Sequence, residues 1–154
     1  LPISNVLGSL YSLTLFRDVN PKTVQLLYPL WQTLDLLIAS SHHKRTINEL
    51  ILMAGSTINL ELIKSSKSLP MVVNSLTKDF NKLEFRQLTW LLFLWNVQRK
   101  IPDHVDLQLV EKRIEEQVKK FSYDQLGILA CAYFKTKTKI NSKLIKDYIF
   151  ERLI

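Results

Sequence analysis

The feature that most constrains the fold is a recurring signal for the start of a helix. Thr46-Ile47-Asn48-Glu49 and Ser122-Tyr123-Asp124-Gln125 each place a hydroxyl three residues before a Glu or Gln side chain. In this capping box the hydroxyl accepts a backbone N–H of the first turn, and the later side chain accepts the N–H of the capping residue. Asn20-Pro21 predicts another start, because proline suits the first helical position. The sequence therefore predicts helices joined by short connections.

Apolar periodicity extends these starts into eight helices and an all-α fold. The chain has only 3 glycines and 5 prolines, too few for the many turns of a β-sandwich or barrel. Asp103 and Asn141 are the expected caps of two of the helices. We place the helices at residues 3–16, 21–39, 46–58, 67–80, 84–99, 104–120, 123–135 and 142–153.

The predicted helices recur with a constant period. Starts fall near positions 46, 84 and 122, and the later intervening helices start near 103 and 141. In the last two periods Leu91 aligns with Leu129, and Trp95 with Tyr133. Two helices per period of about 38 residues are typical of α-solenoids. We therefore expect one helical-repeat domain over 1–154, a right-handed α-solenoid of about four antiparallel helix pairs, with an ordinary helical bundle as the alternative.

Apolar side chains cover two faces of the predicted helix 84–99. Leu92 and Trp95 lie on one face, whereas Trp90 and Phe93 lie on the other. A helix that is apolar on two faces is expected to lie between neighbouring helices. At this spacing tryptophans are more often core residues than platforms for stacked bases. The same expectation applies to Trp31, Tyr133 and Phe134.

Small residues share a face of the predicted helix 123–135. Gly127 and Cys131 are four residues apart, which places them one above the other on a helix. We expect this face to admit a closely packed neighbour, with Cys131 as a small core residue.

The composition excludes several classes of protein. One cysteine rules out a disulfide framework and a Cys-x-x-Cys site, and the three glycines are too scattered for a phosphate-binding loop. The longest apolar runs are only a few residues, so no segment is expected to span a membrane. His42-His43 lack a nearby carboxylate or thiol, and no metal site or cofactor is predicted. The chain begins at Leu1 and is expected to be a segment of a longer protein.

A known family shares the pattern of the second half of the chain. The clearest part is YDQLGILACAYFKTKTK, Tyr123 to Lys139, with Leu-Gly in the first turn, a small Ala/Cys centre, an aromatic residue and a Lys/Thr-rich end. The stretch from about 81 to 153 resembles the helical region of the FAST-kinase-domain proteins. Residues 1–80 share only the helical character of that family's upstream repeats.

The resemblance implies a mitochondrial matrix protein that acts in RNA stability, processing or translation. Family members carry helical repeats followed by a RAP domain, and no such α/β segment is visible in this sequence. The sequence also lacks the Gly-rich loop, HRD motif and DFG motif of a kinase, since Asp79-Phe80-Asn81 has no glycine. We therefore expect a chain that is not an enzyme and takes no small-molecule substrate.

Basic residues form the main candidate site. The formal net charge is +7, and residues 81–154 carry 14 Lys and Arg against 9 acids, whereas residues 1–80 carry 7 against 5. Phosphate backbones bind such clusters with release of counterions. A charged turn that is only solvated is the alternative. The candidate phosphate-binding residues are Lys135, Lys137, Lys139, Lys143 and Lys146, which lie in one acid-free run, and Arg99 and Lys100, which end the helix one period earlier.

Polar pairs early in two successive helices are candidates for base recognition. Repeat proteins read bases with side chains from equivalent helices, and Arg86-Gln87 is equivalent to Asp124-Gln125. The capping role of Gln125 is the competing explanation.

The predicted function is a non-catalytic module for single-stranded RNA, a mitochondrial mRNA or rRNA, with RNA-processing or ribosomal proteins as further partners. The alternative is a protein-binding scaffold, adaptor or ribosome-associated subunit, which exposure of Leu36, Leu37 and Ile38 would favour.

Overall fold

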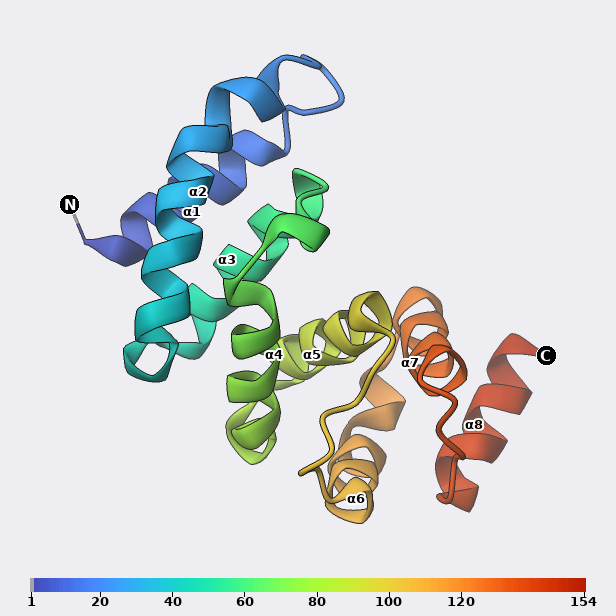
Figure 1. The fold of residues 1–154 in the computed structure, drawn as a ribbon. Helices are drawn as coiled ribbons and strands as arrows, with labels where there is room; N and C mark the ends of the chain where they lie inside the picture. The colour runs from blue at the N-terminus through green and yellow to red at the C-terminus, as the bar shows by residue number, and fades with distance from the viewer. Residues whose placement is uncertain (1) are drawn as a thin grey trace. The chain divides into compact units, whose positions relative to one another are not determined.

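A computed structural model describes residues 2–154 and confirms the all-α prediction. Within these residues the chain forms eight α-helices, four short 3₁₀ helices and no strand (Figure 1). Each α-helix boundary lies within three residues of its predicted position. The α-helices are α1 (Ile3–Thr14), α2 (Thr23–Ser41), α3 (Ile47–Asn59), α4 (Ser68–Lys78), α5 (Phe85–Gln98), α6 (Leu107–Gln117), α7 (Tyr123–Lys135) and α8 (Lys143–Leu153). The 3₁₀ helices are η1 (His42–Lys44), η2 (Ile63–Ser65), η3 (Phe80–Lys82) and η4 (Val118–Lys120).

The chain divides into two compact units, Leu1–Leu76 and Thr77–Ile154. In the first unit α1, α2 and α3 pack against one another. In the second unit α5 packs against α7, and α8 packs against both α6 and α7. Each unit buries its own set of leucines and one tryptophan, Trp31 or Trp95. The single domain over 1–154 remains a prediction.

Among the described residues, three helices begin with a capping box, and the boxes are evenly spaced along the chain. The predicted boxes at Thr46 and Ser122 are confirmed, and a third begins midway between them at Glu84, where a carboxylate replaces the usual hydroxyl. Three 3₁₀ helices, η1, η3 and η4, precede these caps and begin at positions 42, 80 and 118, with the same even spacing. The chain therefore enters α3, α5 and α7 by the same local path.

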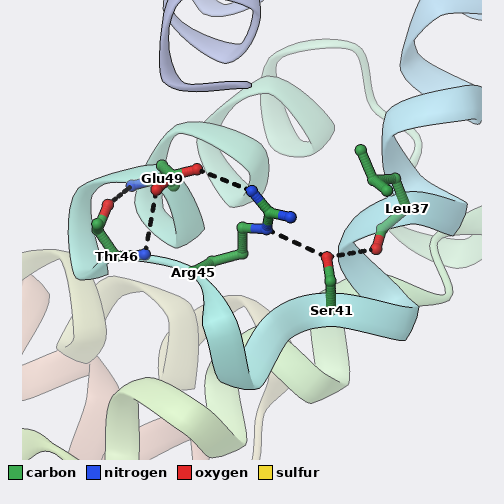
Figure 2. Close-up of polar contacts among 5 residues, drawn as sticks. All are labelled: Leu37, Ser41, Arg45, Thr46 and Glu49. Carbon is green, nitrogen blue, oxygen red and sulfur yellow. Dashed lines mark hydrogen bonds and ion pairs between the residues drawn. The ribbon is translucent and has the colours of Figure 1, made fainter. Parts of the chain in front are cut away.

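Figure 2 shows the first of these caps together with the arginine that precedes it. The Glu49 N–H donates to Thr46 Oγ1 at 3.2 Å, and the Thr46 N–H donates to Glu49 Oε1 at 3.2 Å. Arg45 pairs with Glu49 Oε2 at 3.6 Å and donates from Nε to Ser41 Oγ at 3.2 Å. Ser41 in turn donates to the Leu37 carbonyl at 2.7 Å (Figure 2). The arginine thus connects the end of α2 to the start of α3.

Some predicted caps are wrong by one to three residues. Asp106 caps α6 in place of Asp103, because Asp106 Oδ1 accepts the N–H groups of the first turn. Ser142 caps α8 in place of Asn141, whose own N–H is bound elsewhere. After Asn20, residues 21 and 22 form a turn, and α2 begins at residue 23.

A buried carboxylate holds the start of α4 against α2. Asp35 is 3% exposed and accepts the side-chain hydroxyls of Ser66 and Ser68, both at 2.7 Å. It also accepts the backbone N–H groups of Lys67 at 2.9 Å and Ser68 at 3.1 Å. A buried carboxylate needs such partners to offset its desolvation. Glu111, which lies two periods later in the chain on α6, plays a comparable role at the start of α8, as described below.

The expected small packing face of α7 is not present. A Cβ placed on Gly127 would meet no atom within 4 Å, and Cys131 is exposed. Phe134 is also 82% exposed, whereas its neighbour Tyr133 is buried. The prediction that this face is buried was wrong because α7 packs against α5 and α8 through its leucine side, which includes Leu129.

Candidate nucleic-acid interface

The helices α5 and α7 end in the same unusual backbone turn, here called the closing turn. Arg99 follows α5 with φ 53°, and Lys137 lies just after α7 with φ 55°. In each case the next N–H donates to the carbonyl five residues earlier, Trp95 at 3.3 Å and Tyr133 at 2.9 Å. Positive φ at this place is usual for glycine and uncommon for other residues. The chain thus places a basic residue at the same point of both turns.

The first unit contains the same turn with the opposite charge. Glu61 follows α3 with φ 57°, and it lies one period before Arg99. Its carboxylate pairs with Arg17 at 2.6 Å. Among the described residues 2–154, the basic closing turns therefore belong to the second unit.

The helices α5 and α7 lie side by side and run in the same direction. Near their starts, the rings of Phe85 and Phe121 are 5.2 Å apart. Near their ends, Trp95 and Tyr133 line the same small internal cavity. Because the helices differ by one residue in length, their closing turns emerge from the same end of the second unit. We call this the basic end.

All seven predicted phosphate-binding residues are exposed. Two of them have acidic partners: Lys100 lies 3.9 Å from Asp103, and Lys143 lies 2.6 Å from Asp147. The hydrogen bond and the charge of Asp147 raise the pKa of Lys143. Within residues 2–154 the other five form no ion pair: Arg99, Lys135, Lys137, Lys139 and Lys146.

The segment 135–146, here called the lysine turn, is fixed near both ends. At its start the closing turn of α7 holds the backbone. Near its end the Asn141 N–H donates to Glu111 Oε1 at 3.0 Å, and the Ser142 hydroxyl donates to Glu115. Glu111 also accepts the Tyr133 hydroxyl at 2.9 Å. A fixed turn loses less conformational entropy when it binds a ligand.

Burial and this hydrogen bond change the acidity of the tyrosine. Burial raises the pKa of Tyr133, and the hydrogen bond and negative charge of Glu111 raise it further. Tyr133 therefore stays protonated and continues to donate to Glu111 at alkaline pH. The contact joins α7 to α6 beneath the lysine turn.

The candidate base-reading residues divide into two kinds. Gln87 and Gln125 each accept the N–H of their capping residue through Oε1 at 2.9 Å. Arg86 and Asp124 are exposed on the first turns of their helices and carry opposite charges. Base reading by these four residues remains a prediction. It requires both glutamines to read bases while they cap their helices.

A groove between α5 and α7 was not anticipated from the sequence. It has a volume of about 260 Å³ and is lined by Thr89, Trp90, Phe93, Gln125 and Ile128. Trp31 and Trp95 are 1% and 2% exposed, as expected for core residues, whereas Trp90 is half-buried. The sequence signal for this groove was the second apolar stripe of α5, which contains Trp90 and Phe93. Periodicity alone could not show that this stripe faces a groove and not another helix.

Other predicted features have structural explanations. His42 Nδ1 lies 2.8 Å from Ser75 Oγ, and no group of three or more His, Cys, Asp or Glu residues within 2–154 is placed to hold a metal ion. Phe80, in the sequence that resembles a kinase motif, is buried in η3. No helix of the described chain has both the length and the hydropathy that crossing a bilayer requires.

Comparisons with protein-family models, curated proteins and solved structures find no match to this chain. The resemblance to FAST-kinase-domain proteins is therefore carried by the residue pattern of 81–153 alone.

Proposed function

We propose that this chain is a non-catalytic module that binds single-stranded RNA at the basic end of its second unit. The observation that carries the proposal is the pair of basic closing turns, Arg99-Lys100 after α5 and Lys137 after α7, at the same end of two parallel helices. Cations spaced along one surface suit the spaced phosphates of a single strand. The RNA partner follows from charge and from the family resemblance.

The proposed architecture is a right-handed α-solenoid of four helix pairs. Its support is the constant spacing of three capping boxes, three 3₁₀ helices and three closing turns. The parallel packing of α5 with α7, and the packing of α6 with α8, agree with stacked helix pairs. In a longer solenoid of this kind, basic closing turns would form a stripe along one edge.

The family resemblance extends the proposal to the cell. It implies the mitochondrial matrix, an mRNA or rRNA target, and a role in RNA stability, processing or translation. RNA-processing or ribosomal proteins are the further partners that such a role implies.

Charge reversal at the basic end tests the proposal. We expect a variant with Glu at Arg99, Lys100, Lys135, Lys137 and Lys139 to keep its helical circular dichroism and lose most affinity for RNA of any sequence. Glu61 already occupies the equivalent of position 137 in the first unit, so the closing turn accepts this side chain. Unchanged RNA affinity in the variant would reject the proposed interface.

A protein-binding scaffold is the second candidate function, and exposed apolar side chains of the first unit favour it. On α2, Leu26 is 73% and Leu36 is 50% exposed, and on the preceding turn Val19 is 81% exposed. Of the three residues named from the sequence, Ile38 is buried and Leu37 is half-buried. Loss of a protein partner on replacement of Leu26 and Leu36 by Ser, with RNA affinity unaffected by the five-residue charge reversal, would support this candidate.

A further inference from the structure

The groove between α5 and α7 suits a flat aromatic ligand. Trp90 and Phe93 contribute two rings whose centroids are 5.9 Å apart and whose planes cross at 77°. The volume of about 260 Å³ lies below the range of about 300–1,000 Å³ that is usual for small-molecule sites. The groove therefore fits a single ring system better than a large ligand.

The polar groups of the groove suit the edge of a nucleobase. Gln125 uses Oε1 for its cap, but its amide nitrogen carries two donors, and the structure shows no partner for them within residues 2–154. Thr89 Oγ1 donates to the Arg86 carbonyl at 2.7 Å, so its lone pairs can accept. A base has both acceptors and donors along its edge, whereas an apolar side chain of a protein partner has neither.

The groove and the basic end belong to the same two helices. Phe93 precedes Arg99 by six residues, which is about 9 Å along a helix. Ile128 precedes Lys135 by seven residues, or about 10 Å. A strand whose phosphates contact the basic end can thus place a nearby base in the groove. The basic end complements the charge of a nucleic acid and adds nothing to the binding of an uncharged peptide.

We propose that this groove holds a nucleobase of the bound single strand, stacked on Trp90 and bounded by Phe93 and Ile128. This inference rests on the proposed function and adds a base-binding subsite to the phosphate contacts. Stacking tolerates any base because every base has a π-face. The groove therefore contributes affinity for any base, and hydrogen bonds donated by the Gln125 amide can favour some bases over others.

Truncation of Trp90 tests the subsite. We expect Trp90→Ala to bind oligouridylate roughly 5- to 150-fold more weakly than the wild type, the effect of losing one stacked base. Trp90→Phe retains an aromatic ring and should recover much of the loss. Phe150→Ala, which removes an exposed ring of α8, is the matched control and should bind like the wild type. All variants should bind a ribose-phosphate strand without bases equally.

The outcomes separate this inference from the proposed function. Wild-type affinity for oligouridylate in Trp90→Ala, together with weakened binding in the five-residue charge reversal, would overturn the base subsite and leave the phosphate interface. Equal losses for oligouridylate and the base-free strand would also overturn it, because stacking requires a base. No binding of either strand by the wild type would overturn the proposed function itself.

Discussion

Arg99 and Lys137 occupy the same position in the closing turns of α5 and α7, both with positive φ and one period apart in the chain. Glycine is the residue that this backbone conformation favours. The chain keeps large cations there instead, at a cost to stability of about 1–2 kcal/mol each. Phosphate binding by the two cations would explain why the chain keeps them in this conformation, and replacement of Lys137 by glycine tests this explanation.

Replacing Lys137 by Gly should raise the free energy of unfolding and lower RNA affinity. Glycine relieves the left-handed backbone, and we expect a gain of up to about 1 kcal/mol by urea denaturation. The control is Lys139→Gly, because residue 139 has no positive φ, and this change should leave stability unchanged or lower it. A fall in stability for Lys137→Gly would show that the lysine side chain stabilises the turn.

Gly127→Ala should stabilise the second unit. The glycine lies inside α7, and a methyl group there would meet no atom within 4 Å. Alanine is favoured over glycine in helices by about 1 kcal/mol. Urea denaturation should show a gain of that order with unchanged RNA affinity. Destabilisation by this substitution would instead support the close helix packing that the sequence predicted for this face of α7.

Tyr133→Phe should destabilise the second unit and alter its dependence on pH. Loss of the hydroxyl leaves the buried Glu111 with one donor fewer, which costs about 1–3 kcal/mol at neutral pH. Because burial and Glu111 raise the pKa of Tyr133, its phenol ionises first in the unfolded chain, above about pH 10. Wild-type stability should therefore fall there by up to about 1.4 kcal/mol per pH unit more than that of the variant. Parallel pH profiles, measured by urea denaturation of both proteins, would contradict this.

Much of the local structure of this chain could be predicted from its capping residues. The boxes at Thr46 and Ser122 form as expected, since these contacts involve residues only three apart. The box at Glu84 was missed because a glutamate is an unusual first residue of the motif. The largest errors fall at α6, which begins and ends three residues inside the predicted range because Asp106 caps its start and η4 follows its last turn.

The candidate site could be predicted only in part. The lysine turn follows from charge alone, because a run of lysines is exposed in almost any fold. The groove could not be predicted from the sequence, because Trp95 and Trp90 both lie in apolar stripes of α5, yet Trp95 is buried and Trp90 is half-buried. Only the packing of α7 against α5 determines which residues remain accessible.

Glutamate in place of Gln125 tests the donor role of its amide. Glu is a normal third residue of a capping box, so helix stability should be retained while the two amide donors are lost. Gln108→Glu is the matched control, because it adds the same charge at an exposed position in the first turn of α6, outside the groove and outside the candidate base-reading residues. We expect a greater loss of oligouridylate affinity for Gln125→Glu, measured by fluorescence anisotropy. Equal losses would assign the effect to charge and exclude a specific contact.

The salt dependence of RNA affinity tests the proposed interface most directly. Two triple variants remove the same charge: Gln at Lys135, Lys137 and Lys139, and Gln at Lys112, Lys119 and Lys120. The second set is exposed, and two of its members lie in η4 before the start of α7, about 20 Å along the helix from the closing turn.

Each phosphate contact to a single strand contributes about 0.7 to the slope of log affinity against log salt. We expect the slope to become shallower by about 2 in the first variant and to stay at the wild-type value in the second. Equal changes in the two variants would contradict the proposed basic end and indicate only a general attraction between a basic protein and RNA.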